Sequence, residues 1–297
     1  MPNPPASEAK NWLSFILLSV IWGASFFWQK YGRVELGPST LVAARFTLAL
    51  LIMLVVMAAR GLRFPRSPNT WLRFFLLSIV YSSVPVFLSS WAGSRIDTTV
   101  GNVLSSTSPL FTVVFATLVF NDEKATRAKT LGTVVGFAGM LVIVLASATD
   151  LALGSNEPLG VVAQIGTAIC YALAPIASRK LLRDEPIIVQ STALAGLAGG
   201  TMWIAAAVSE PINLPTLPAT WAALLWLGAL SSAAANLLYF SLLRSWGSTR
   251  SSLISYTSPI IGVALGALLL GEHINTGFVA GAALILAGVY VANRSGA

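Results

Sequence analysis

Ten stretches of apolar residues, each about 20 residues long, constrain this chain more than any other feature. Lipid offers the backbone no hydrogen-bond partner, so a segment that crosses a hydrocarbon core about 30 Å thick folds as a helix of about 20 residues. We therefore expect an all-α polytopic membrane protein with ten transmembrane helices. The predicted spans are Asn11–Tyr31, Pro38–Ala59, Trp71–Gly93, Thr98–Phe120, Ala128–Ala148, Leu159–Leu182, Pro186–Val208, Thr220–Leu243, Ser251–Leu270 and Gly277–Ala292.

The composition favours lipid as the solvent. Of 297 residues, 56% are hydrophobic and 10% are charged, and the mean hydropathy is +0.78; soluble domains carry about a quarter charged residues. A single cysteine, Cys170, excludes an internal disulfide, and a single histidine, His273, argues against a His/Cys metal cluster. The net charge of +7 is spread between the apolar runs, unlike a nucleic-acid-binding patch. We expect no metal, no cofactor and no nucleic-acid partner.

Basic residues divide unevenly between the loops if the predicted spans alternate strictly. Three of the 18 Lys and Arg residues, Lys30, Arg33 and Arg95, fall on one face, and Arg45 lies inside a span. Short cytoplasmic loops carry the excess of positive charge, so we expect a plasma-membrane protein, in a bacterium an inner-membrane protein, with both termini cytoplasmic. The other 14 basic residues fall on the face of the termini: Lys10, Arg60, Arg63, Arg66, Arg73, Lys124, Arg127, Lys129, Arg179, Lys180, Arg183, Arg244, Arg250 and Arg294.

An internal repeat divides the chain into two halves of five spans. The sequence TSPL at Thr107–Leu110 recurs 150 residues later as TSPI at Thr257–Ile260. Each copy precedes an acidic loop residue, Asp122 or Glu272, and then a glycine-rich span. Because five is odd, the halves would enter the membrane from opposite sides, as inverted repeats do in many secondary transporters. We predict repeats over residues 1–149 and 150–297; chance similarity among glycine-rich helices is the alternative.

These features resemble the EamA-type transporters of the drug/metabolite transporter superfamily over nearly the whole chain. The resemblance rests on the segment PSTLVAARF at Pro38–Phe46, the Trp22–Gly23 pair, and the Ser-Pro spans that precede glycine-rich spans. It implies a ten-helix inverted-repeat fold around a central cavity lined mainly by helices 1, 3, 4, 6, 8 and 9. It also implies export of small metabolites, with YddG-like amino-acid exporters as a near group. The chain departs from the repeat at Ile187–Val208, which has no counterpart of Arg45.

Polar and aromatic side chains near mid-span are the candidate binding residues. A proline removes one helix N–H and frees a carbonyl, which a cavity can satisfy, and an aromatic ring with a polar tip suits an amphipathic organic solute. The alternative is that these residues bond neighbouring helices or bend their own. The predicted helix-break prolines are Pro85, Pro109, Pro175 and Pro259, and the predicted substrate-binding residues are Trp22, Tyr81, Ser82, Asn102, Ser105, Ser106, Tyr171, Asn236, Tyr239, Ser255 and Tyr256.

Arg45 is the ionisable residue that lies well inside a predicted span, ~10 Å from the start of its helix. One hypothesis is that it docks a substrate carboxylate; the alternative is that it snorkels to the interface or bonds helix-end carbonyls. All 11 acidic residues fall in loops or at span ends. We therefore expect ion coupling to be weak, peripheral or absent.

The leading prediction is a carrier that exports small amphipathic metabolites, above all amino acids, by alternating access. A nucleotide-sugar or sugar-phosphate exchanger is the first alternative, and a channel is the second. The interior offers no nucleophile with a base and no metal site, so we expect no enzyme activity. Small residues spaced four apart, as at Gly132 and Gly136 or Gly277 and Gly281, predict seams within the molecule. We expect a monomer in the lipid bilayer, with a dimer as the alternative.

Overall fold

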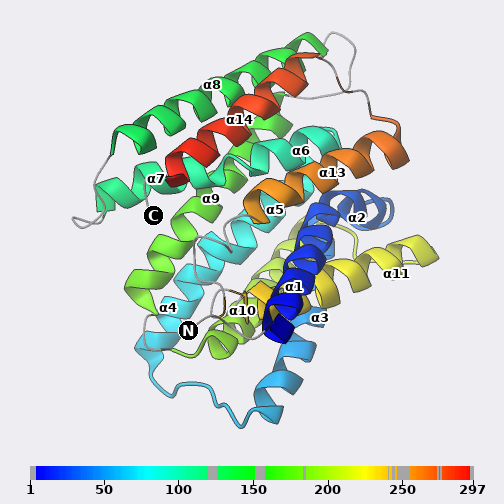
Figure 1. The fold of residues 1–297 in the computed structure, drawn as a ribbon. Helices are drawn as coiled ribbons and strands as arrows, with labels where there is room; N and C mark the ends of the chain where they lie inside the picture. The colour runs from blue at the N-terminus through cyan, green and yellow to red at the C-terminus, as the bar shows by residue number, and fades with distance from the viewer. Residues whose placement is uncertain are drawn as a thin grey trace.

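The computed structural model describes residues 5–119, 126–150, 158–182, 185–239, 241–242, 245, 254–272, 274 and 276–294. Over these residues the chain is built of helices and contains no strand (Figure 1), which confirms the predicted all-α class. The elements in chain order are α1 (Pro5–Gly23), α2 (Ser25–Gly32), α3 (Pro38–Ala59), α4 (Pro68–Ser78), η1 (Ile79–Ser83), α5 (Val84–Ala92), α6 (Thr98–Ser105), α7 (Ser108–Val119), α8 (Arg127–Asp150), α9 (Pro158–Leu181), α10 (Ile187–Ser209), α11 (Pro218–Leu225), η3 (Trp226–Ala234), α13 (Ile254–Leu270) and α14 (Thr276–Arg294).

Several helical stretches are long and apolar enough to cross a membrane. Among the described residues they are Glu8–Gly32, Pro38–Ala59, Pro68–Ala92, Ile187–Ser209 and Pro218–Tyr239. Shorter apolar helices cover Thr130–Val142, Pro158–Ala174, Ile260–Leu270 and Thr276–Gly288. The chain is therefore a polytopic membrane protein. One predicted span, Pro38–Ala59, has the same bounds as helix α3.

Helices from distant parts of the sequence pack side by side. Helix α8 lies along α14, α3 along α10, α5 along α9, and α6 along α13 (Figure 1). Glycines allow α8 and α14 to touch backbone to backbone, since a Cβ on Gly139 would lie 2.6 Å from the carbonyl oxygen of Gly281. A Cβ on Gly288 would lie 2.5 Å from that of Gly132. These small residues form a seam inside one molecule, as predicted.

Two apolar clusters lie beside the starts of α4 and α11. Phe74 and Leu77 of α4 pack with Leu182 and Val189, which flank the α9–α10 connection. Leu224 of α11 and Leu227 of η3 pack in the same way with Leu36 and Leu41, at the α2–α3 connection. Each cluster thus joins the start of a span to a connection from the other half of the sequence.

The same turn precedes α4 and α11. Residues 65–71 read PRSPNTW and residues 215–221 read PTLPATW. The Trp71 indole N–H donates to the Pro65 carbonyl at 3.0 Å, and the Trp221 indole N–H donates to the Pro215 carbonyl, also at 3.0 Å. These hydrogen bonds fix the start of each helix and so give both tryptophans a structural role.

The helix is irregular just before two of the four predicted helix-break prolines. The π-helix η1 ends two residues before Pro85, and the Val84 N–H bonds the carbonyl five residues back, on Ile79. Helix α6 ends at Ser105, and α7 begins one residue before Pro109. The predicted breaks at Pro175 and Pro259 are wrong, because α9 and α13 continue as α-helix through both positions. A proline costs a helix one hydrogen bond, and neighbouring helices can accommodate that loss without an interruption.

Candidate functional site

Arg45 of α3 is the centre of the candidate site. Its Nε donates to the Ser232 hydroxyl at 2.6 Å, and its Nη2 lies 3.4 Å from the Ser231 hydroxyl. Both serines are buried and belong to the π-helix η3. Gly228 lets α3 approach η3 closely, since a Cβ there would lie 2.9 Å from the Arg45 carbonyl oxygen. The guanidinium is therefore held by hydroxyl groups of the mid-span segment of a neighbouring helix.

Aromatic side chains lie near this arginine and near the serines that hold it. The Trp22 indole N–H donates to the Ser231 carbonyl at 3.3 Å, and the Trp22 and Tyr239 rings are 5.5 Å apart between centroids. Tyr171 lies close enough to Arg45 to interact with it electrostatically. Tyr81 of η1 interacts in the same way with Tyr171 and Tyr239.

We call Trp22, Arg45, Tyr81, Tyr171 and Tyr239 the arginine–aromatic cluster. Its members come from separate spans, which contain α1, α3, η1, α9 and the residues after η3. No member is fully buried, and Tyr81 keeps 37% of its surface exposed. The structure thus gathers five predicted site residues in one place.

The arginine–aromatic cluster carries a positive charge without a matching acid. No described carboxylate forms an ion pair with Arg45. Placing a guanidinium at mid-span costs about 3 kcal/mol on insertion scales, and serine hydroxyls supply dipoles but no charge. A planar guanidinium with this surplus charge can bind a carboxylate through two parallel hydrogen bonds.

The remaining predicted binding residues make mostly local bonds. Asn236 donates to the Ser232 carbonyl at 2.6 Å and so braces the segment that holds Arg45. Asn102 donates to the Thr98 carbonyl at 3.0 Å, within α6. The Ser105 hydroxyl accepts a hydrogen bond from Gln164 of α9 at 2.6 Å. The Ser106 hydroxyl donates to the Val103 carbonyl of α6 at 2.6 Å. Ser82 is buried in η1. The side chains of Ser255, Tyr256, Pro175 and Pro259 lie outside the described part of the chain.

Sequence reasoning missed Ser231 and Ser232, which hold Arg45. The repeat contained the signal, because Ser232 stands 150 residues after Ser82, a residue that we did predict. It also missed the π-helices η1 and η3, whose positions correspond under the same shift. Such π segments are frequent at functional sites, but nothing in an apolar run distinguishes them from α-helix.

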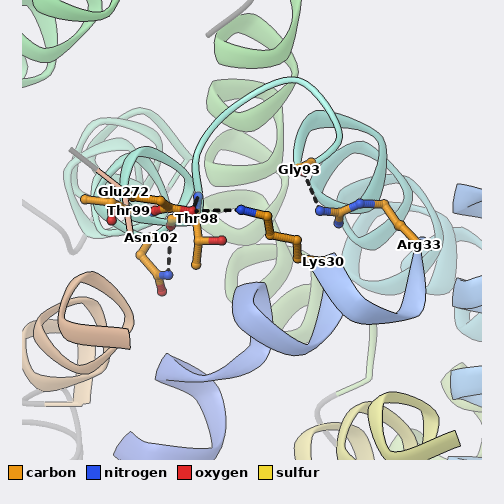
Figure 2. A network of polar contacts seen from close by, with 7 residues as sticks. All are labelled: Lys30, Arg33, Gly93, Thr98, Thr99, Asn102 and Glu272. Atoms are coloured by element: carbon orange, nitrogen blue, oxygen red, sulfur yellow. Dashed lines mark hydrogen bonds and ion pairs between the residues drawn. The ribbon is translucent and has the colours of Figure 1, made fainter. Parts of the chain in front are cut away.

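A network of charged side chains ties several helices together at one end of the molecule (Figure 2). The Glu272 carboxylate accepts hydrogen bonds from the N–H groups of Thr98 and Thr99, each at 2.8 Å, and lies 3.6 Å from the Lys30 ammonium. Arg33, just after α2, donates to the Gly93 carbonyl at the end of α5. Burial lowers the pKa of Arg33 to about 10, so it stays charged at neutral pH.

Two more carboxylates cap helices at the same end. Glu35, between α2 and α3, accepts bonds from the N–H groups of Thr216 and Leu217, at 2.9 and 3.0 Å, and from the hydroxyls of Thr216 and Thr220, both at 2.6 Å. We call this set the Glu35 cap. The hydroxyl bonds, with the backbone bonds, lower the pKa of Glu35 to about 2.

Glu210, after α10, caps α3 in the same way. It accepts bonds from the N–H groups of Ser39 and Thr40, at 2.8 and 3.0 Å. Burial alone would raise the pKa of Glu210, but these donors outweigh it and hold the pKa below its usual value. Helices α3, α6 and α11 have no capping side chain of their own, so their first N–H groups depend on carboxylates from other loops.

A polytopic helical protein with an arginine–aromatic cluster between its spans has the features of a membrane transporter, and the comparison with known families agrees. The model of the EamA-like transporter family matches residues 10–145 and again residues 158–294. This chain therefore belongs to the EamA-like transporter family and is a membrane transporter.

Relatives cover nearly the whole chain at low identity. An uncharacterized transporter of Archaeoglobus fulgidus is 24% identical over 96% of this chain and 99% of its own length. The uncharacterized inner membrane transporter YedA of Escherichia coli K12 is 24% identical over 87% of this chain and 82% of its own length. A probable amino-acid metabolite efflux pump of Salmonella typhimurium is 24% identical over 93% and 92%. One crystal structure matches with a TM-score of 0.69 at 20% identity, over 95% of this chain and 97% of that one, which shows a shared fold.

Proposed function

We propose that this transporter is a carrier that exports small amphipathic metabolites, above all amino acids, by alternating access. Its ten spans would form two inverted halves, residues 1–149 and 150–297, with both termini cytoplasmic. The two consecutive family matches support this arrangement, and so does the tryptophan turn that recurs 150 residues later. The Escherichia coli relative bears the name of an inner membrane transporter, which supports the same membrane for this chain.

The observation that carries the proposed substrate class is the unpaired guanidinium of Arg45 beside aromatic rings. A solute with a carboxylate and an apolar side chain would satisfy both, since the carboxylate would face Arg45 and the apolar part would lie against Trp22, Tyr171 or Tyr239. The Salmonella relative carries the name of an amino-acid metabolite efflux pump, which is consistent with this chemistry. Tyr81 would complete the wall of the site.

A nucleotide-sugar or sugar-phosphate exchanger is the competing proposal. Phosphate groups are normally held by several Arg or Lys side chains, whereas the described residues place one guanidinium in the arginine–aromatic cluster. A single cation suits a carboxylate better than a doubly charged phosphate. We therefore favour amino acids and keep sugar phosphates as a comparison in the test.

The test measures efflux from proteoliposomes loaded with labelled leucine, leucine amide or a hexose phosphate. We expect wild type to move leucine in preference to its amide, which lacks the carboxylate. Arg45→Gln should lower that preference about tenfold, since about 1.4 kcal/mol of carboxylate recognition corresponds to a factor of ten. Arg63→Gln, the same change on an exposed loop, is the matched control.

Two outcomes would contradict the proposal. Folded, membrane-inserted Arg45→Gln protein that moves leucine and leucine amide with the relative rates of wild type would remove the docking role of Arg45. Faster efflux of the hexose phosphate than of leucine by wild type would favour the exchanger instead.

A further inference from the structure

The Glu35 cap joins elements that are far apart in the sequence. Glu35 lies in the connection between α2 and α3, and its four hydrogen bonds all come from the start of α11. The carboxylate therefore holds the α2–α3 connection against the start of α11. We call this end of the molecule the Glu35 end.

The 150-residue repeat places the same groups at the opposite end, where α9 finishes and α4 begins (Figure 1). Glu185 corresponds to Glu35, Ser67 to Leu217, and Thr70 to Thr220. The start of α4 has the same tryptophan turn as the start of α11. The apolar cluster of Phe74 and Leu77 also corresponds to that of Leu224 and Leu227. We call this end the Glu185 end.

The structure does not form the corresponding cap at the Glu185 end. Within the described part of the chain, the hydrogen bonds of Glu185 involve its backbone: its N–H donates to Leu182 at 3.2 Å, and its carbonyl accepts from Gln190 at 2.9 Å. The N–H groups of Arg66 and Ser67, which correspond to the two N–H donors of the Glu35 cap, bond no other described residue. One end is therefore capped, while among the described residues the equivalent groups at the other end form no such cap.

We propose that Glu185 forms the matching cap on α4 in the opposite conformation of the carrier, so that the Glu35 and Glu185 caps close the two ends in turn. In that conformation its carboxylate accepts bonds from the N–H groups of Arg66 and Ser67 and from the Thr70 hydroxyl. This inference rests on the proposed alternating-access function. Glu35 and Glu185 are positioning residues, since neither contacts the arginine–aromatic cluster.

The two caps are unequal. Thr216 supplies both an N–H and a hydroxyl to Glu35, whereas Arg66 at the corresponding position has no hydroxyl. Ser67, in turn, has a hydroxyl that Leu217 lacks, so the two caps differ in which residues can supply their donors. Other charges of the Glu35 end also recur 150 residues away in the sequence: Lys180 corresponds to Lys30, Arg183 to Arg33 and Asp122 to Glu272. The side chains of Lys180, Arg183 and Asp122 lie outside the described part of the chain, and the proposal does not depend on them.

Two distances report the two ends independently of transport. In a Cys170→Ser background, spin labels at Val34→Cys and Leu214→Cys span the Glu35 end, since both native side chains are exposed. Labels at Asn69→Cys and Ile187→Cys span the Glu185 end. Pulsed electron–electron double resonance in lipid nanodiscs then measures each distance distribution and, from it, the ratio of the two conformations.

We expect wild type to populate mainly the form with the Glu35 end closed. Glu35→Gln should raise the fraction with a shortened distance at the Glu185 end about tenfold, and adding Glu185→Gln should reverse that gain about tenfold. Glu185→Asp in place of Glu185→Gln should keep most of the gain. Glu210→Gln is the matched control for two reasons. Glu210 caps α3 from the end of α10, and these two helices already pack along each other. The position that corresponds to Glu210 in the first half is Arg60, so no second carboxylate can form a matching cap there. Glu210→Gln should change the ratio by less than twofold.

The proposal is overturned if Glu35→Gln never shortens the distance at the Glu185 end, or if adding Glu185→Gln leaves the shortened population unchanged. The proposal would also be overturned if Glu210→Gln changed the ratio of the two conformations as much as Glu35→Gln does, because the effect would then not be specific to the Glu35 cap. Both distances are measured without solute. Distances that respond as expected while amino-acid efflux is absent would refute the substrate class and leave the two caps standing.

Discussion

Replacing Glu272 tests whether these carboxylates act mainly as helix caps or as ion pairs. The Glu272 side chain is 3% exposed and accepts two backbone hydrogen bonds at 2.8 Å, whereas its partner Lys30 is 47% exposed and 3.6 Å away. Hydrogen bonds to a charged group contribute about 1.5–3 kcal/mol each. Glu272→Ala leaves the buried N–H groups of Thr98 and Thr99 without an acceptor, so we expect a loss of at least ~3 kcal/mol in the free energy of unfolding.

The matched change on the other partner should cost far less. Lys30→Ala removes a half-exposed ion pair that contributes about 0.5 kcal/mol. Thermal unfolding in detergent at one scan rate should show a fall in Tm of at least ~6 °C for Glu272→Ala, at about 2 °C per kcal/mol for a chain of this size. Lys30→Ala should lower Tm by about 1 °C. Equal losses in the two variants, or none in Glu272→Ala, would refute the view that capping outweighs the ion pair.

Three further predictions follow from single contacts. Gly266→Ala should reproduce much of the Glu272→Ala loss, because the new Cβ would lie within 2.5 Å of the Glu272 carboxylate; Gly200→Ala, where a Cβ meets nothing within 4 Å, is the control, and equal Tm values would contradict the steric argument. The pKa of Glu35 is lowered to about 2, so the stability that its charged form contributes is full above pH ~4.5 and is lost as pH falls toward 2; a Tm difference between wild type and Glu35→Gln that does not shrink over that window would contradict this. Trp221→Phe removes the hydrogen bond to Pro215, and we expect it to lower the free energy of unfolding by about 1 kcal/mol, measurable against wild type by the same thermal assay; an unchanged Tm would count against a structural role for that bond.

The sequence predicted the all-α class and the bounds of α3 because lipid imposes a strong pattern on apolar helices. A run of apolar residues bounded by Pro38 and Arg60 can form little else in a bilayer, and α3 spans Pro38–Ala59 as predicted. The glycine seam between α8 and α14 was predictable for a similar reason, since close packing in lipid depends on small residues.

The sequence did not predict how the loops bond to helix ends. We placed Glu35, Glu210 and Glu272 only in loops or at span ends, because nothing local indicates which distant N–H groups an acidic residue will meet. These contacts depend on tertiary packing across more than 170 residues of sequence. Ser232 was missed for the same reason: its significance comes from Arg45, 187 residues away.

The π-helix η3 makes the spacing of the following residues sensitive to chain length. Because a π turn accommodates one more residue than an α turn, deleting a single residue within Trp226–Ala234 could restore regular α-helix without shortening the span noticeably. Everything downstream would then rotate by about 100° around the helix axis. Tyr239 would turn away from the Trp22 ring that it now faces. A one-residue gap at this place in a related sequence should therefore mark a transporter with a different choice of cargo, even where every other residue is the same.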